Sequence, residues 1–503
     1  MSSVTEARPL IQGNSRVYSG FAGMDRSLPR TAMERQDRQA LWTLRNAYVD
    51  WRGVIRSDPA LSRMLPGVQD RIKSLRFYRR GGVVWATQLE GAVRVDSDRG
   101  ISLDQVYDKD AIVNFAYYQK KAVALSRGYP MAFFDGGHWS QSTLNMTPGF
   151  GCAISRRLAV AGFADEPTVV HICRADDIST FPENETDDDS ETRAAFIDVG
   201  NLLGTADEIT GLGAFEAKRL AIFTADQALL YALDVAISSW SIDERANIRV
   251  GCASAATIRN AGTDLIFCSR YGVHAITRNE NNVILPVTLS APIEKVYRAL
   301  VRALPDTQLM SALYDDDNGL YHIYIPKPGT IGATRLTLNL RAGYQKPQWS
   351  VGDTLTATCG DALAGLVVVG TPGGVYSQLQ PDLTLPVLSD LDAQRGTVEV
   401  LTPILWMGNS ETTKDAVELL VRAAGEGKLE LTGYDEEGEE LLSVDLDIEG
   451  ADEQDDELPD TTLANQYAVP FAVRFRGLQL QIKSSGAGNI ELVSVAIKLQ
   501  GSA

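Results

Sequence analysis

The chain of 503 residues lacks the features that identify several protein classes. Its five cysteines are scattered and form no CxxC pair: Cys152, Cys173, Cys252, Cys268 and Cys359. An odd, dispersed set predicts reduced, buried thiols and neither a disulfide framework nor a metal site. No run approaches the roughly 20 apolar residues of a membrane helix, and the opening MSSVTEARPLIQGNSR is not a secretory signal. We therefore expect assembly in a cytosol, with no membrane insertion by this chain, no metal and no cofactor.

Catalytic motifs are also missing. There is no GxSxG or HExxH, and residues 329–334 (GTIGAT) lack the lysine of a P-loop. Residues 315–319 (DDDNG) resemble the start of a calcium loop without its later glutamate, so that a hairpin turn is favoured. The acidic run at 183–191 indicates a solvated loop insertion. These absences predict a protein that is not an enzyme, although paired carboxylates for glycoside hydrolysis stay open.

Only four histidines are present, and they are isolated from one another. His171, His274 and His322 lie inside expected strands, where a packed side chain is the simpler interpretation. His138 follows Asp135-Gly-Gly in an expected turn and is the one loop candidate.

Charge is distributed unevenly along the chain. The formal net charge is −18, yet no Lys or Arg occurs between Lys428 and Arg474, an interval with fifteen acids. Removing those fifteen leaves −3 for the rest, and residues 1–80 carry fifteen basic against seven acidic residues. A uniformly basic nucleic-acid binder is thereby excluded.

Short apolar runs recur from about Leu75 to Leu379 and are separated by Gly, Asp, Asn and Pro. Six strand–turn–strand units are recognisable, at 122–133, 158–173, 220–233, 265–276, 320–340 and 366–379. Their spacing of roughly 40 to 60 residues is close to the blade period of a β-propeller. The sequence therefore predicts a mainly β protein with about six blades.

Three regions follow from this pattern. Residues 1–72 are expected to be an N-terminal arm with short helices, one of them amphipathic over Met33–Val49. Residues 73–390 are expected to form the propeller, with a one-sided helix inserted near 293–304. Residues 391–503 alternate like an antiparallel β-sandwich that contains the acidic segment 430–460.

Three stretches, in order along the chain, resemble the tail hub, tail tubular or nozzle proteins of short-tailed bacteriophages. The opening stretch joins Gly20-Phe-Ala-Gly-Met-Asp25 to a segment with Asn46, Asp50 and Gly53. The middle stretch runs through 219–233, 249–252 and 264–276. The closing stretch comprises Thr402-Pro-Ile-Leu-Trp-Met-Gly408, Lys414, 474–482 and 489–497. The motifs are degenerate individually, and their order is what carries the resemblance.

The resemblance implies a structural virion protein without catalytic residues. It implies a six-fold ring below the portal and the tail adaptor that conducts DNA during ejection and anchors fibres, spikes or a needle, assembled in the host bacterial cytoplasm. The chain is shorter than the long nozzle proteins, so hub and distal nozzle both stay open. Two alternatives stay open as well. One is a propeller that binds or processes carbohydrate, and the other is a receptor-binding tail fibre.

Two charged segments are the candidate contact sites. The acidic candidates, for the DNA channel or a partner, are Asp435, Glu436, Glu437, Glu439, Glu440, Asp452, Glu453, Asp455, Asp456 and Glu457. The basic candidates of the arm are Arg26, Arg30, Arg35, Arg38, Arg45, Arg52 and Arg56. The acids either face transiting DNA and repel it, dock on the basic arm of a neighbour or the adaptor, or form a solvated loop.

Overall fold

The fold is known from a computed structural model. It describes residues 15–31, 39–64, 71–79, 82–89, 91–187, 189–203, 207–243, 248–341, 343–353, 357–378, 396–407, 410–448, 464–485 and 489–499. Strands dominate these ranges. None of the helices found in them has the length and apolar character needed to cross a membrane.

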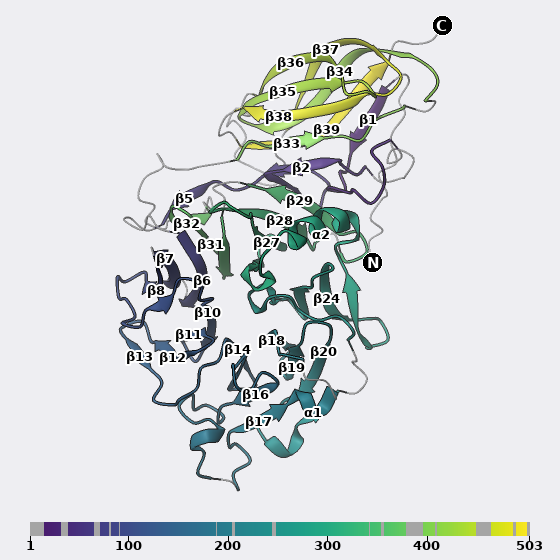
Figure 1. The fold of residues 1–503 in the computed structure, drawn as a ribbon. Coiled ribbons are helices and arrows are strands. Elements are labelled where there is room, and N and C mark those ends of the chain that lie inside the picture. The colour runs from purple at the N-terminus through teal and green to yellow at the C-terminus, as the bar shows by residue number, and fades with distance from the viewer. Residues whose placement is uncertain are drawn as a thin grey trace, which may run out of the picture.

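Seven four-stranded antiparallel units form a β-propeller, and a β-sandwich stands at one side of the ring (Figure 1). The first four blades are β6–β9 (Arg71–Arg79, Gly82–Leu89, Ala92–Ser97, Tyr107–Asp108), β10–β13 (Asn114–Tyr118, Lys121–Ser126, Tyr129–Phe134, Trp139–Gln141), β14–β17 (Phe150–Ile154, Arg157–Ala161, Val169–Ile172, Ala195–Asp198) and β18–β21 (Gly211–Phe215, Arg219–Phe223, Ala228–Ala232, Ser241–Ile242).

The remaining blades are β22–β25 (Arg259–Ala261, Asp264–Cys268, Val273–Arg278, Ile284–Thr288), β26–β29 (Ser311–Asp315, Leu320–Pro326, Ala333–Asn339, Gln348–Gly352) and β30–β32 (Cys359–Leu363, Leu366–Thr371, Gly374–Gln378) with β5 (Leu61–Arg63). Short helices connect them: η2 (Pro182–Asn184), α1 (Val199–Leu203), η3 (Ile237–Ser239), η4 (Ala255–Thr257), η5 (Ala291–Ile293), α2 (Glu294–Arg302) and η6 (Thr307–Leu309). The helix expected near 293–304 is thus present as α2.

The six hairpins expected from the sequence are the second and third strands of six blades. These middle strands are buried on both faces, as in β31, and therefore read as continuous apolar runs. The sequence predicted about six blades, and the structure has a seventh, formed by β6–β9. Its β7–β8 hairpin mixes buried Val83 and Val84 with Gln88 and Arg94, which hides the apolar run.

An N-terminal strand closes the propeller. The last blade has only three strands from its own part of the chain, and β5 supplies the fourth by pairing antiparallel with β32. Ser62 lies opposite Ser377 in this register. The last blade is therefore completed by segments more than 300 residues apart, which ties the N-terminal segment to the end of the propeller.

Two sheets form the sandwich. One has the order β3-β4-β39-β34-β37 with β1 on β39, over Ala47–Val49, Ile55–Ser57, Ile490–Leu499, Lys414–Gly425, Asn465–Phe475 and Ser15–Ser19. The other ends in β33-β38-β35-β36, over Glu399–Leu401, Gln479–Ser485, Gly427–Tyr434 and Glu440–Ile448. Leu419, Leu431 and Phe471 are buried in one core that continues into the propeller through Trp349.

Strand β2 (Thr43–Arg45) joins the propeller to the sandwich. Arg45 pairs in parallel with Val351 of β29, and Thr43 pairs antiparallel with Leu401 of β33. Blade β26–β29 and one sandwich sheet therefore form a single nine-stranded sheet. In Figure 1, β2 lies between β29 below and β33 above.

Asn46 turns the chain from one sheet of the sandwich to the other. It is buried with φ 52°, a left-handed conformation, between β2 and β3. Its side-chain amide donates to Asp353 at 2.8 Å and to the Thr397 carbonyl at 2.9 Å, and its side-chain oxygen accepts from the Asp353 N–H at 2.9 Å. These bonds fix both flanks of β2.

The expected arm with short helices is wrong for its described part. Residues 15–63 contain β1 to β5 and no α-helix in the ranges described; residues 33–38 of the expected helix lie outside those ranges. Leu41, Leu44 and Ala47 are all buried, and their spacing of three imitates a helical stripe. The reason is that Asn46 resets the strand alternation where the chain changes sheets.

We predict that Asn46→Ala lowers the free energy of unfolding by about 2–4 kcal/mol. Three partly buried hydrogen bonds are lost, and alanine tolerates a left-handed φ poorly. Chemical denaturation followed by circular dichroism measures the loss. Asn282→Ala is the matched control, because Asn282 is also left-handed (φ 62°) but lies in an exposed turn. Equal losses of unfolding free energy in the two variants would contradict a special role for the connection through β2.

Candidate functional site: the axial cavity and the charged surfaces

The propeller encloses a cavity on its axis. Its volume is about 410 Å³, and the first strand of every blade contributes to its lining. Small residues such as Gly213 and Gly360 let these strands converge, since a Cβ at Gly360 would lie 2.5 Å from a Leu313 methyl. The cavity is thus a consequence of radial packing.

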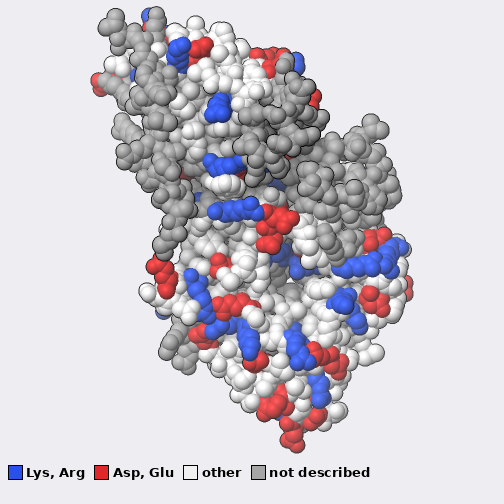
Figure 2. All heavy atoms as spheres, turned by 180° about the vertical axis from the view of Figure 1, so that it is seen from behind, with Lys and Arg blue, Asp and Glu red and all other residues white. Residues whose placement is uncertain are grey.

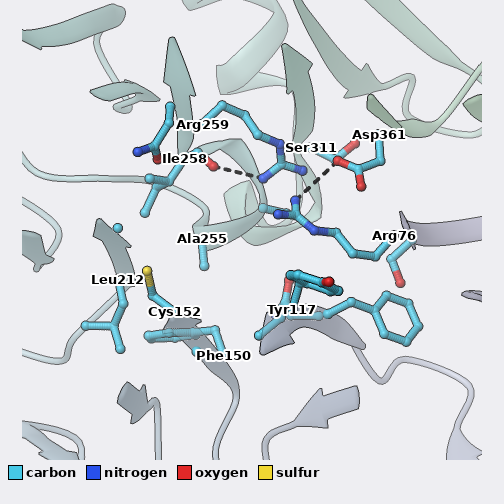
Figure 3. Close-up of a pocket in the computed structure, with 18 of the residues that line it drawn as sticks. Arg76, Tyr117, Phe150, Cys152, Leu212, Ala255, Ile258, Arg259, Ser311 and Asp361 are labelled. Atoms are coloured by element: carbon cyan, nitrogen blue, oxygen red, sulfur yellow. Dashed lines mark hydrogen bonds and ion pairs between the residues drawn. The ribbon is translucent and has the colours of Figure 1, made fainter. Parts of the chain in front are cut away.

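Two guanidinium groups and one carboxylate face each other in this cavity (Figure 3). Arg76 on β6 lies 3.2 Å from Asp361 on β30, whose other oxygen accepts the Phe77 N–H at 3.0 Å. Arg259 on β22 donates to the Ile258 carbonyl at 2.8 Å, and its Nε has no partner. Burial, with Arg76 nearby, lowers the pKa of Arg259 to about 10, still well above neutrality.

The other wall of the cavity is largely apolar. Figure 3 shows Tyr117, Phe150 and Leu212 around the side opposite Arg259, with Cys152 among them. Burial raises the pKa of Cys152 to about 12, so its thiol is protonated and is a poor nucleophile. Asp361 is the one carboxylate among the residues described as lining the cavity, which leaves glycoside hydrolysis without its second carboxylate at this place.

The acidic candidates are divided between described and undescribed residues. Asp435 caps the β35–β36 turn by accepting the N–H groups of Glu437, Gly438 and Glu439. Glu436 pairs with Arg476 at 2.8 Å, whereas Glu437, Glu439 and Glu440 are exposed. Asp452, Glu453, Asp455, Asp456 and Glu457 lie outside the described residues.

Strand β36 shows one physical role for the described acids. It is the edge strand of the nine-stranded sheet, and Asp445 and Asp447 are exposed on it. Charged side chains on an edge strand oppose pairing with another sheet. This part of the segment is a hairpin with an acidic edge rather than a loop.

The basic candidates are engaged within the chain wherever the structure describes them. Arg26 donates to the Trp42 carbonyl and the Thr43 hydroxyl; Arg30 donates to Gln479. Arg45 lies 3.5 Å from Asp353, Arg52 lies 3.1 Å from Asp50, and Arg56 contacts Asp50 and Glu491 at 3.0 and 3.2 Å. Arg35 and Arg38 lie outside the described residues. These five arginines thus have partners within the chain, although Arg45, Arg52 and Arg56 stay partly exposed, and their role as contacts for a neighbour or the adaptor stays a prediction.

Acidic and basic residues alternate over the propeller face seen in Figure 2. Ion pairs within the propeller include Arg278 with Glu216 at 2.5 Å and Arg127 with Glu208 at 3.2 Å. The visible propeller surface is thus mixed in sign, and grey atoms cover much of the upper part of this view.

Histidines occupy the positions expected from the sequence. His171, His274 and His322 lie in β16, β24 and β27, and His138 is exposed in a turn 3.1 Å from Asp135. His274 is bonded to the Ser269 hydroxyl at 2.9 Å, and burial lowers its pKa to about 4. The DDDNG stretch is the β26–β27 turn, closed by Asp315 on Asn318.

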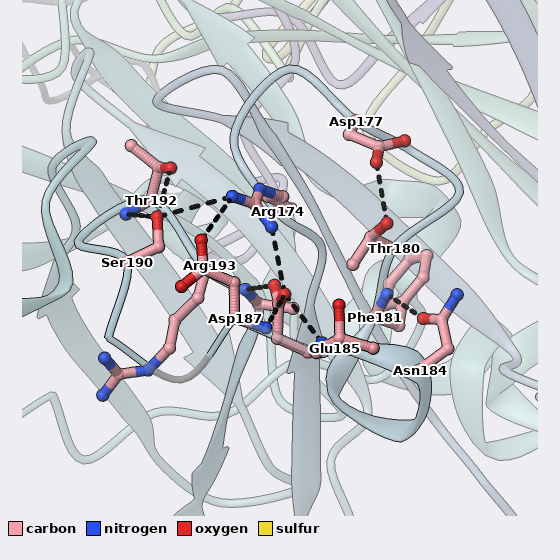
Figure 4. Close-up of polar contacts among 12 residues, drawn as sticks. Arg174, Asp177, Thr180, Phe181, Asn184, Glu185, Asp187, Ser190, Thr192 and Arg193 are labelled. Carbon is pink, nitrogen blue, oxygen red and sulfur yellow. Dashed lines mark hydrogen bonds and ion pairs between the residues drawn. The ribbon is translucent and has the colours of Figure 1, made fainter.

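The acidic run at 183–191, of which residue 188 lies outside the described ranges, connects β16 to β17 and is held by polar contacts (Figure 4). Glu185 has a side chain only 4% exposed, and it accepts from Arg174 at 3.0 Å and from the Ala194 N–H at 2.8 Å. Arg174 also approaches Asp187 at 3.3 Å. Most described residues of the run are exposed, as expected for a solvated loop insertion, and the pair of buried Glu185 with partly buried Arg174 anchors it.

Sequence reasoning missed Arg76, Arg259 and Asp361. Arg259 and Asp361 lie on the short innermost strands β22 (RNA) and β30 (CGDAL). Arg76 lies on the nine-residue β6 (RIKSLRFYR), in which charged residues interrupt the apolar ones, so that none of the three strands reads as an apolar run. A search for the strand preceding each recognised hairpin would have found Arg259 and Asp361, since β22 and β30 directly precede β23 and β31.

No known protein family and no curated protein matches the sequence. Solved structures that are similar include PorZ, a surface component of the type-IX secretion system of Porphyromonas gingivalis (11% identity, TM-score 0.36), with 71% of this chain and 44% of PorZ covered. Virginiamycin B lyase of Staphylococcus aureus is 8% identical with a TM-score of 0.41, and the match covers 63% of this chain and 97% of the lyase. YCF48 of Cyanidioschyzon merolae is 10% identical with a TM-score of 0.38, and the match covers 64% of this chain and 100% of YCF48. The chain thus spans less than half the length of PorZ. These likenesses concern the β-propeller fold alone.

We predict that the loop at 181–187 opens as pH rises above about 6.5. Burial disfavours the charged His171, but bonds to Glu183 and Glu166 (3.0 and 2.7 Å) outweigh it and raise its pKa. A raised pKa in the fold gives stability that is complete below the unfolded pKa of about 6.5 and disappears as pH rises through the folded value. Hydrogen exchange at pH 6 and 8, corrected for intrinsic rates, measures this opening.

His171→Gln should abolish that pH dependence, and His138→Gln should leave it unchanged because His138 is exposed. An identical pH response in all three proteins would refute the assignment to His171.

Proposed function

We propose that this protein is a structural subunit of a short bacteriophage tail. It forms a ring, six-fold by the family resemblance, below the portal and adaptor, and conducts DNA while anchoring fibres, spikes or a needle. Its place is the virion tail after assembly in the bacterial cytoplasm. The proposal gives the protein no enzymatic role.

The observation that supports this proposal best is the continuous sheet through β2. Backbone hydrogen bonds on both sides of β2 connect the propeller and the sandwich, so that the two move as one body. A subunit in a tube wall needs this stiffness, because a flexible joint would let neighbouring subunits slip during DNA passage. A binding module carried on a linker has no such need.

The arginine contacts bear on where the acidic segment lies in the ring. Five arginines in the described part of the arm already have partners within the chain, so that docking of a neighbour's acids would have to compete with these bonds. We therefore favour acids that face the DNA path, where they repel phosphates and keep the polymer from adhering.

Assembly tests the proposal directly. Native mass spectrometry of the purified chain, alone and with its tail adaptor, should give a ring, with six copies expected. A chain that stays monomeric with the adaptor and binds glycans would favour the carbohydrate-binding alternative, and a stable trimer would favour a tail fibre. Either outcome would overturn the tail-hub proposal.

We predict that neutralising Asp452, Glu453, Asp455, Asp456 and Glu457 to Asn and Gln slows DNA ejection and leaves assembly intact. The physical reason is the loss of repulsion between the wall and the phosphates. Single-particle ejection kinetics measure the rate. A matched control neutralises five exposed acids of the propeller, Asp104, Asp110, Asp165, Asp226 and Glu280, and should leave ejection unchanged. Salt-dependent loss of incorporation of the variant into virions would instead indicate that the acidic segment docks on the basic arm of a neighbour or the adaptor. Normal assembly together with normal ejection would leave the interpretation as a solvated loop.

A further inference from the structure

We propose that the axial cavity binds a small carboxylate with an apolar body, held by Arg259. This inference is independent of the proposed tail role. It concerns a cavity inside one chain, whereas the tail role concerns the ring of copies.

The charges in the cavity are unbalanced. Its lining contains Arg76, Arg259 and the carboxylate of Asp361. Asp361 is already engaged by Arg76 and by the Phe77 N–H. A second guanidinium next to this pair leaves one positive charge without a counterion in a partly enclosed space, which is energetically unfavourable.

The hydrogen bonding of Arg259 is also incomplete. Among the described residues it donates one bond, from Nη1 to the carbonyl of its neighbour Ile258. Its Nε is buried without an acceptor, although a guanidinium offers five N–H donors.

Arg157 shows how this chain otherwise accommodates a buried guanidinium. Arg157 is fully buried, and its two terminal nitrogens donate to three carbonyls, those of Cys173, Arg193 and Val235, at 2.7–2.8 Å, although its Nε, like that of Arg259, has no acceptor. No such set surrounds Arg259. The remaining N–H groups of Arg259 line a cavity instead, where they can donate hydrogen bonds to an oxyanion that enters from outside.

The cavity also limits what that oxyanion can be. A volume of about 410 Å³ accommodates a small molecule. Figure 3 shows Tyr117 and Phe150 on the side of the cavity away from Arg259, and the cavity is partly open to solvent. A planar carboxylate matches the fork of a guanidinium, and an apolar body matches the aromatic wall. Benzoate combines both features.

Calorimetric titration at constant ionic strength tests the site with benzoate, acetate and inorganic phosphate. Benzoate should bind most tightly. Arg259→Gln should weaken its binding at least about tenfold, since a charge-assisted bond is lost. Asp361→Asn should tighten it, because a competing carboxylate is removed. Arg298→Gln is the matched control, as it removes one positive charge from the exposed face of α2.

Arg259→Lys keeps the charge without the fork and should give an intermediate affinity, which preserves the test if Arg259→Gln does not fold. Equal affinity for benzoate in wild type, Arg259→Gln and Arg298→Gln would overturn the proposal. So would binding of phosphate without binding of benzoate, or no binding of any of the three anions by the wild-type chain.

Discussion

The rest of the structure depends on the pairing of β2 with a strand on each side. Three residues, Thr43–Arg45, connect blade strand β29 to sandwich strand β33, and the buried amide of Asn46 fixes the turn that follows. Because the strand is short, its backbone bonds depend on this turn, and the core around Leu44 and Trp349 depends on both. Loss of the pairing of β2 with β29 and β33 would divide the sheet that the propeller and the sandwich share.

The N-terminal segment is used three times in this arrangement. It contributes β1, β3 and β4 to the sandwich, β2 to the connection between the sandwich and the propeller, and β5 to the last blade of the propeller. Its arginines pair with carboxylates that lie nearby only in the folded chain, such as Arg56 with Glu491. A segment that looks like a basic arm in the sequence is therefore structural. The acids of β36, in contrast, stay exposed at a sheet edge, where their mutual repulsion opposes pairing with other chains.

The charged groups of the cavity illustrate why the candidate site was not accessible to sequence reasoning. Arg76, Arg259 and Asp361 are separated by more than 100 residues between each adjacent pair along the chain, and only ring closure brings them together. His171 gives the opposite case. Its position inside a strand was expected from the sequence, but the two glutamates that raise its pKa come from loops on either side of that strand.

The sequence by itself determined the mainly β character, six of the blade hairpins, helix α2 and the sandwich strands. It did so because strands buried on both faces must be apolar throughout, and a helix with one buried face must carry a stripe. Tertiary structure alone decided the seventh blade, the fate of the N-terminal segment and the charged cavity. The physical reason is that backbone hydrogen bonds and ion pairs between distant segments leave no periodic signal. Asn46 interrupts the inward–outward alternation of side chains between β2 and β3. The reason is visible only in the folded chain, where its side chain bonds to Asp353 and Thr397.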